Sequence, residues 1–469
     1  MTVAVLGIDL GMSGARAAVI DGAGKLLGRG RARHPASGQV DDRIERDPMD
    51  WIGEVFAAAR AALADAGRPR VEAIGIGALG PCPVLLDADL EPVGPAPLFS
   101  IDSRAQPQRR RLIDSLGLAD DDVGQDHVVP RLLWMQENEP ARFGRAVRVV
   151  DAAGFVVARL TGRAAIDPIT ARDHRLPDLE SPVPLPEILP ADRIAGGLVP
   201  DAAAQLGLSA GTPVTVGTYD SYVDIAGAGV ATSGDACMLL GTTLILGRVT
   251  AERHAAAGLR ATPHLGEGWF FGGWTSAAGT VLNWARDVFG EAAEAAARDL
   301  APGAGGLVAL PYLAGERAPI WDPFARGAAL GLTLGTSKPE LYRAMLDAVV
   351  LSGLDLATRL GEVAGLPDCW RAGGGGTRHP AWAQAMCDAL GRPVEIVAHA
   401  GEAVPPALLA LRALGRGAEP QIARTLLPDA GRHARYGRLY PIYRDLYPRL
   451  ADAMHALGRF AEETAKEDS

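Results

Sequence analysis

The residues with the clearest chemical potential lie near the N-terminus, where Asp9 is followed by Gly11, Ser13 and Gly14. Glycines let backbone N–H groups approach an anion closely, so this turn is a candidate phosphate site. Asp9 would repel a phosphate unless a divalent cation lay between them, and Mg²⁺ held by carboxylates, water and phosphate oxygens is the usual arrangement. The alternative, on these residues alone, is a glycine-rich β-turn with a capping carboxylate.

The same theme recurs at Gly241, Thr242 and Thr243, which lie between the apolar runs CMLL and LILG. A third glycine-rich loop, 373–376, precedes a predicted helix, and a helix N-terminus favours phosphate or heteroatom acceptors. The apolar segment VTVGTYD ends at another carboxylate, Asp220. Together these segments predict a nucleotide held between two domains. They indicate phosphoryl transfer or nucleotide hydrolysis, with no acceptor identified.

The elements that must position these residues begin with three apolar runs at 3–10, 15–21 and 25–33, separated by glycine turns. Strand, glycine turn and strand in succession predict an antiparallel meander. A dinucleotide-binding fold instead needs a helix directly after its glycines. No helix-length segment fits before the next turn, so the spacing disfavours a hydride-transfer enzyme.

Helices are predicted further along the chain. Residues 47–67 have Asp47 as N-cap, Pro48 in the first turn and Gly67 as the stop. A buried strand, VEAIGIGALG, follows, and 131–139 is another helix. The clearest helix is 337–365, because its first residues form a capping box and its apolar residues recur at helical spacing.

Length, charge and composition limit the classes of protein to which this chain can belong. A chain of 469 residues is too long for one hydrophobic core, which predicts two domains, and we place them at 1–231 and 232–469. The net charge of −10 matches neither nucleic acid nor an anionic membrane. No apolar run is long enough to span a bilayer, and the N-terminus lacks the basic start of a secretory signal. The four cysteines form no CxxC pair, which predicts a reduced cytoplasmic protein without structural zinc.

With these segments side by side, the sequence resembles the FGGY carbohydrate kinases of the actin-like ATPase superfamily, over nearly its whole length. GIDLGMSGARAAVID is similar to the family's first phosphate motif, and GAALGLTLGTSKPELYRAMLD to its second signature. VPRLLWMQENEP, LPYLAGERAPIWDP and GGGGTRHPAWAQAMCDALGRPV are similar to other family segments in the same order. The resemblance implies an α/β fold of two actin-like (ribonuclease H-like) domains. Each would be a mixed sheet flanked by helices, with ATP and sugar in the cleft between them.

The resemblance also implies roles for individual residues. Asp220 matches the catalytic base, and Asp9 matches the carboxylate that works with Mg²⁺. Asp102 and Arg104 match an Asp-x-Arg segment on the sugar side. The positions that match nucleotide contacts are Gly11, Ser13, Gly14, Gly241, Thr242, Thr243, Gly374, Gly375, Gly376 and Gln384.

Two segments depart from the family pattern. Gly80 and Pro81 stand where members of the family carry polar residues for the sugar, so the resemblance does not assign the substrate. Asp224 is either a replacement polar contact or a solvated helix carboxylate. Pro405 and Pro406 replace small residues of the family near the nucleotide, so the adenine pocket is also in question.

The resemblance therefore predicts ATP- and Mg²⁺-dependent phosphorylation of a sugar or polyol, such as the ketopentose xylulose, by a xylulokinase-like enzyme. The alternative is a catalytically silent sensor that binds sugar or nucleotide. A hydrolase or chaperone of the superfamily is disfavoured by the match to the second signature. A homodimer is a further expectation.

Overall fold

The computed structural model describes residues 4–34, 39–40, 43–98, 102, 104–118, 123, 127–176, 179–266, 268–399, 402–417 and 419–467. Contacts divide the chain into two compact units. The first contains Met1–Gly227 and Glu402–Gln421, and the second contains Ala228–Gly401 and Ile422–Ser469. The sequence placed the division after residue 231 and assigned 402–421 to the second domain. The cleft expected between the domains stays a prediction.

The first unit is built on a mixed sheet with helices on its faces. Its strands are β1 (Ala4–Gly11), β2 (Gly14–Asp21), β3 (Leu26–Arg33), β4 (Gln39–Val40), β5 (Arg43–Arg46), β6 (Val71–Ala78), β7 (Val84–Leu86), β8 (Ala96–Pro97), β9 (Arg148–Val150), β10 (Ala165–Ile166), β11 (Glu187–Ile188), β12 (Ile194–Gly197), β13 (Pro213–Thr215) and β14 (Thr218–Tyr219). Its helices are α1 (Pro48–Asp65), α2 (Gln106–Leu116), α3 (Val128–Asn138), α4 (Pro140–Phe143), α5 (Ala152–Thr161), α6 (Pro168–Asp173), α7 (Pro200–Leu206), α8 (Asp220–Gly227) and α13 (Val404–Ala413).

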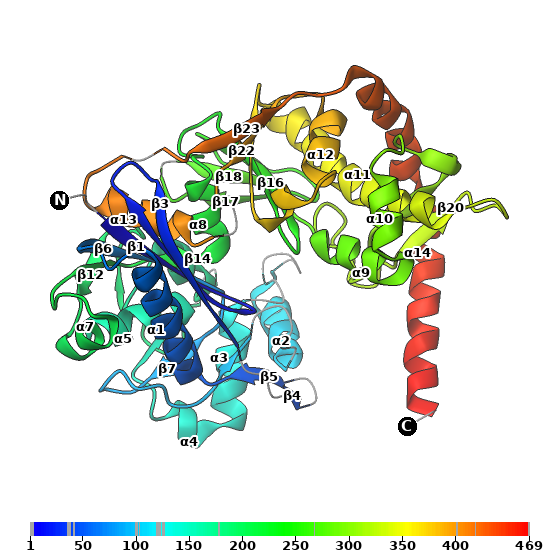
Figure 1. Ribbon diagram of the computed structural model, residues 1–469. Coiled ribbons are helices and arrows are strands. Elements are labelled where there is room, and N and C mark those ends of the chain that lie inside the picture. Colours follow the sequence, from blue (N-terminus) through cyan, green and yellow to red (C-terminus); the bar gives the residue numbers. More distant parts are fainter. Residues whose placement is uncertain are drawn as a thin grey trace. The chain divides into compact units, whose positions relative to one another are not determined.

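The main sheet of this unit has the strand order β12-β13-β6-β1-β2-β3, with β14 also paired to β6. The predicted meander is confirmed, because β1, β2 and β3 pair antiparallel in chain order. The other neighbour of β1 is β6, which runs parallel to it. Helix α1 packs on β2 and β3, whereas α13 packs on β1 and β6 (Figure 1).

Side chains of β1 alternate between these two layers, as the twofold period of a strand requires. Its even-numbered residues, from Ala4 to Leu10, join the core beneath α1 and α5. Val5 joins the core beneath α13, and a Cβ on Gly7 would lie 2.3 Å from the carbonyl oxygen of Ala403. Asp9 therefore belongs to the α13 side of the strand.

The second unit repeats the architecture. Its strands are β15 (Ala236–Leu240), β16 (Leu244–Thr250), β17 (Arg260–Pro263), β18 (Trp269–Trp274), β19 (Val308–Leu310), β20 (Ala328–Leu330), β21 (Trp370–Gly373), β22 (Val394–Val397) and β23 (Ile422–Leu426). Its helices are α9 (Gly279–Phe289), α10 (Glu291–Ala297), α11 (Lys338–Ala364), α12 (Trp382–Leu390) and α14 (Ala430–Glu467), with 3₁₀ turns at Ala304–Gly306 and Gly375–Arg378.

The sheet of the second unit has the order β17-β18-β16-β15-β21-β22-β23. An antiparallel hairpin, β15–β16, lies beside the parallel strand β21, as β1–β2 lies beside β6. The outermost pair, β22 and β23, is antiparallel, as is β12 with β13. The two units therefore share one topology, which confirms the predicted α/β class with mixed sheets and helices.

The predicted helices are confirmed with small changes of boundary. The N-cap of α1 is Asp47, whose carboxylate accepts the backbone N–H of Met49 at 2.8 Å. Helix α11 has the predicted capping box of Ser337 and Glu340 and ends before Gly365. The helix predicted at 131–139 is α3, which starts three residues earlier.

Candidate active site

Asp9 lies near the carboxyl end of β1, opposite Arg16 in the register of β2. Its side chain is buried and forms an ion pair with the Arg16 guanidinium. Burial raises the pKa of Asp9, while the Arg16 charge opposes that rise. The second carboxylate oxygen, Oδ1, is buried and has no hydrogen-bond partner among the described residues. An unpartnered buried anionic oxygen is an available ligand for a cation.

Two more carboxylates come from α8. Asp220 is the first residue of the helix, and its Oδ1 accepts the backbone N–H of Ser221 at 2.7 Å. Asp224 lies four residues on, so both belong to one face of the helix. Burial, reinforced by the charge of Asp9, raises the pKa of Asp220 to about 7. Burial, together with the charges of Asp9 and Asp220, also raises the pKa of Asp224 well above its ordinary value.

The structure thus brings together the three predicted carboxylates, Asp9, Asp220 and Asp224, with Arg16, which the sequence reasoning missed. Arg16 interacts electrostatically with all three of them. The strand register, which places it opposite Asp9, was the signal that could have found it. We call these four residues the carboxylate cluster.

The fit of a metal ion can be tested against this cluster. Within the described part of the chain, no group of three or more His, Cys, Asp or Glu side chains is arranged to hold a metal. Mg²⁺ does not require such a group, since it commonly binds one or two carboxylates and completes its shell with water and substrate phosphates. The free Oδ1 of Asp9 fits that demand, so Asp9 can serve as the single protein ligand.

The first glycine hairpin lies directly beyond Asp9. Gly11 and Gly14 are paired and buried, whereas the turn residues Met12 and Ser13 are exposed. Gly14 has a φ of +135°, and a Cβ there would lie 2.0 Å from the Ala32 carbonyl oxygen. His34 fixes the turn from β3: its Nε2 lies 2.8 Å from the Gly11 oxygen, and its backbone N–H donates to the Ser13 oxygen. The exposed turn is therefore held in one conformation.

The second unit brings the other two predicted loops together. The turn Gly241–Thr243 joins β15 to β16, and Thr242 is exposed. Gly374 has a φ of +85°, and a Cβ on it would lie 2.6 Å from the oxygen of Leu240, at the end of β15. A Cβ on Gly376 would lie 2.8 Å from the same oxygen. Only glycines can pass this close, so the loop and the hairpin form one glycine-lined region.

Gln384 lies on α12, and its side-chain NH₂ group makes two hydrogen bonds within the second unit. Its Nε2 donates to Asp388 Oδ1 at 2.7 Å and to the Leu427 carbonyl oxygen at 3.0 Å. These bonds join α12 to the segment that leads into α14. Its expected contact with adenosine stays a prediction.

Asp102 and Arg104 are placed in a buried network of their own. Arg104 donates from Nη2 to Asp102 Oδ2 and from Nη1 to Glu45 Oε1, both at 2.6 Å. Asp102 also accepts the backbone N–H of Ile44 at 2.9 Å. The Arg104 guanidinium lies 4.8 Å from the ring centre of Trp134. Both polar side chains are thus satisfied within the first unit, and their expected role at the sugar stays a prediction.

The two departures from the family pattern have packing reasons. A Cβ on Gly80 would lie 2.3 Å from ring atoms of the buried Tyr219, so this position has no room for a side chain. Pro405 packs against Gly227, and the Pro406 oxygen lies where a Cβ of Gly75 would be, at 1.7 Å. The two prolines therefore lie in the first turn of α13 and pack it against the first unit.

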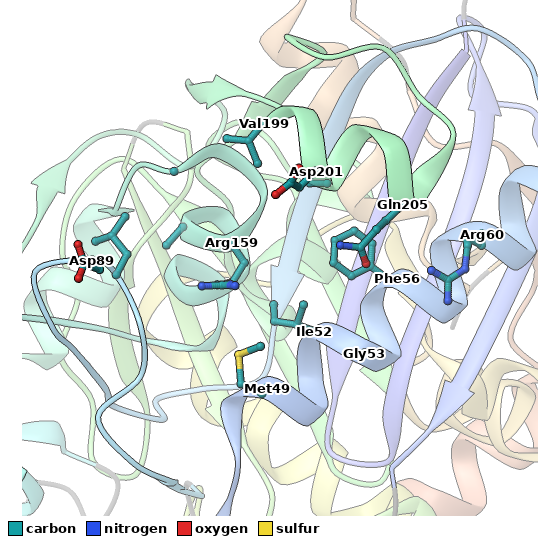
Figure 2. A pocket seen from close by; sticks show the side chains of 14 residues that line it. Met49, Ile52, Gly53, Phe56, Arg60, Asp89, Arg159, Val199, Asp201 and Gln205 are labelled. Atoms are coloured by element: carbon teal, nitrogen blue, oxygen red, sulfur yellow. The ribbon is translucent and has the colours of Figure 1, made fainter.

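A cavity of about 530 Å³ lies elsewhere in the first unit, at the junction of α1, α5 and α7. Figure 2 shows Ile52, Phe56, Arg159, Asp89 and Asp201 among the residues that line this cavity. None of the predicted site residues is among those that line it.

A search of the described helices for a membrane-spanning segment finds none with the required length and hydropathy.

Comparison with known proteins identifies the family. Residues 4–182 match the N-terminal domain of the FGGY family of carbohydrate kinases, and residues 236–414 match its C-terminal domain. The chain belongs to this family, and it is a carbohydrate kinase. The matched C-terminal segment includes α13, which packs in the first unit.

Its relatives have different named substrates. The chain is 27% identical to the xylulose kinase of Escherichia coli (strain K12), with coverage of 96% of this chain and 99% of that protein. It is 28% identical to the glycerol kinase of Alkalilimnicola ehrlichii, over 92% and 95% of the two chains. The crystal structure of xylulose kinase from Rhodospirillum rubrum superposes with a TM-score of 0.84 at 27% identity, covering 96% of this chain and all of that one.

Proposed function

We propose that this kinase transfers the γ-phosphoryl group of ATP to a hydroxyl of a sugar or polyol, most simply a ketopentose such as xylulose, with Asp220 as general base. The observation that carries the proposal is the position of Asp220 in the carboxylate cluster, where burial and the charge of Asp9 raise its pKa to about 7. A base with a pKa near the working pH combines ionisation with proton affinity.

The chemistry needs a proton acceptor and stabilisation of the phosphate charge. Asp220 accepts the proton of the attacking hydroxyl, and Arg16 of the same cluster offers a positive charge to the phosphate. The backbone amides of each glycine hairpin are further donors for phosphate oxygens. Phosphoryl transfer passes through a loose transition state, so positioning and electrostatics supply most of the rate enhancement. Mg²⁺, bound through Asp9, would neutralise phosphate charge.

The proposed sugar contacts take into account that position 80 has no polar side chain. Gly80 cannot present a side chain, because Tyr219 fills the adjacent space. We assign the missing polar contact to Asp224, which shares a helix face with Asp220. Asp102 and Arg104 would act on the sugar side only through the atoms that their mutual ion pair leaves open.

A coupled ADP-release screen tests the activity. The wild-type protein, with Mg²⁺ and ATP, is offered pentuloses, hexuloses, tetritols and glycerol. Turnover of one neutral polyol class supports the proposal. Binding of sugar or nucleotide with no ADP release across the panel would instead support the silent sensor that the Gly80 departure suggests.

The variant Asp220→Asn tests the base. Asn caps a helix as well as Asp does, so a purely structural role would leave turnover intact. Loss of a general base should lower kcat by about 10²–10⁴-fold while ADP affinity is retained. The matched control is Asp47→Asn, the same change at the N-cap of α1, which should leave kcat unchanged.

The expected homodimer stays a prediction that sedimentation velocity can check.

A further inference from the structure

We propose that Glu316 is a positioning residue for the nucleotide: it fixes the loop that holds the second glycine hairpin, Gly241–Thr243. The inference rests on the proposed function, because it assigns that hairpin to the phosphates of ATP. It extends that function to a residue of the GERAP segment with no assigned part in the reaction.

Glu316 is buried, and its carboxylate binds the backbone at two points. Its Oε1 accepts the N–H of Ser276 at 2.6 Å and the N–H of Arg317 at 2.8 Å. Backbone hydrogen bonds to Asp322, at 2.9 and 2.8 Å, hold the main chain of Glu316 itself. A carboxylate anchored in this way fixes the position of Ser276 in the loop after β18.

Residues 275–279 of that loop bind the hairpin directly. The backbone N–H of Leu244 donates to Thr275 Oγ1 at 2.9 Å, and the Thr275 N–H donates to the Leu244 oxygen at 2.9 Å. Further along, the N–H of Ala278 donates to the Thr242 oxygen at 2.8 Å. The Gly279 N–H reaches the Gly241 oxygen at 3.1 Å. The loop therefore holds both arms of the turn that exposes Thr242.

Arg317 binds the same loop. Its Nη2 donates to the Thr275 carbonyl oxygen at 2.6 Å. The hydrogen bonds of both side chains thus run to the backbone of this stretch, at Thr275, Ser276 and Arg317. Two adjacent residues thus direct their side chains to one loop and, through it, to one hairpin.

Three variants separate this role from a general packing role. Glu316→Gln keeps an oxygen that can accept both N–H groups, so ADP affinity should stay within about threefold of wild type. Glu316→Leu leaves two buried N–H groups unpaired and should weaken ADP binding by about tenfold. Glu316→Asp shortens the side chain and serves in its place if the Leu variant does not fold.

ADP affinity is measured by isothermal titration calorimetry on the full chain, with hydrogen exchange of residues 241–244 and 275–279. Expected results are weaker ADP binding and faster exchange in the Leu or Asp variant, with rescue by Gln. The matched control is Asp347→Asn. Asp347 is also buried in the second unit, but the backbone N–H that it accepts, at 2.9 Å, is that of Gly303 and not one of the loop after β18. It should change thermal stability without changing ADP affinity.

The outcomes are distinct. If wild type binds ADP and the Leu and Asp variants bind it equally well, the role of Glu316 is overturned while the proposed function stands. If Asp347→Asn loses ADP affinity as strongly, Glu316 acts only through overall stability, and the inference also fails. If wild type does not bind ADP, the assignment of the hairpin to nucleotide fails, together with the proposed function.

Discussion

Asp220 has two properties that follow from one environment. It is the proposed base, and burial beside Asp9 raises its pKa to about 7. A base acts only when deprotonated, so its active fraction falls about tenfold for each pH unit below that pKa. We expect kcat/KM to rise with pH up to about 7 and then to level off.

A pH–rate profile between pH 5.5 and 8.5 checks this expectation. The phosphate of the nucleotide also titrates in this range, so ADP affinity measured at each pH provides the control. A profile that is flat below pH 7, once corrected for binding, would show that Asp220 titrates near its ordinary value and would contradict the prediction.

The same raised pKa has a cost in stability. Between about pH 4 and 7 the unfolded chain releases this proton while the folded protein keeps it, so stability falls as pH rises through that window. Above pH 7 the full penalty is present. Asp220→Asn removes the charge, and we expect a higher Tm than wild type at pH 8 but not at pH 4. Thermal unfolding at the two pH values, without Mg²⁺, decides the matter.

Sequence patterns located Asp9, Asp220 and Asp224 individually, because each lies in a recognisable local motif. They missed Arg16, because its place opposite Asp9 emerges only when the two strands are paired in register about the glycine turn. Nor could they show that Tyr219 leaves no room for a side chain at position 80, because the two residues meet only in the folded chain.

At the scale of elements, the contact of α13 with the sheet depends on glycine. The oxygen of Pro406 lies 1.7 Å from the position of a Cβ on Gly75. Gly75→Ala should therefore displace α13 and destabilise the protein by about 1–3 kcal/mol, as overpacking commonly does. Chemical denaturation measures the change.

Gly53 supplies the opposite control. It lies inside α1, and a Cβ there would meet no atom within 4 Å. Gly53→Ala should stabilise the protein by about 0.5–1 kcal/mol, because alanine has the higher helix propensity. Equal effects of the two substitutions would mean that α13 does not press on β6 as described.

The helices with strong local signals were the predictable elements. Asp47 at α1 and the Ser337–Glu340 box at α11 satisfy the first N–H groups of each helix, and this requirement is local. The local sequence of the helix at 404–413 does not indicate in which unit the helix packs. Its neighbours, β1 and β6, lie more than 300 residues earlier in the chain, beyond the reach of any local pattern.

At the scale of the whole molecule, the units are not contiguous in sequence. A fragment of residues 1–231, the domain expected from the sequence, would lack α13 and expose Val5, Ala18, Ile20 and Ala73. We expect this fragment to aggregate or to unfold without cooperativity. Circular dichroism during heating, together with size-exclusion chromatography, gives the readout.

A second fragment, in which α13 is restored, tests whether the missing helix is the cause of the instability. Gly227 packs against Pro405, so a short flexible linker can join residue 227 to residue 402 and restore α13 by ending at residue 421. This fragment should unfold cooperatively. If the shorter fragment folds equally well alone, α13 is not needed to complete the first core.

The passage of α13 into the first unit also sets an order of events on the ribosome. The face of β1 and β6 is made early in translation, but the helix that covers it, α13, emerges only after the segment Ala228–Gly401 of the second unit has been synthesised. Domains otherwise tend to fold from the N-terminus as the chain grows. During synthesis, the side of β1 and β6 that α13 later covers therefore stays exposed as an apolar surface. We expect chaperones that bind exposed apolar surface to bind the nascent first unit at this stage.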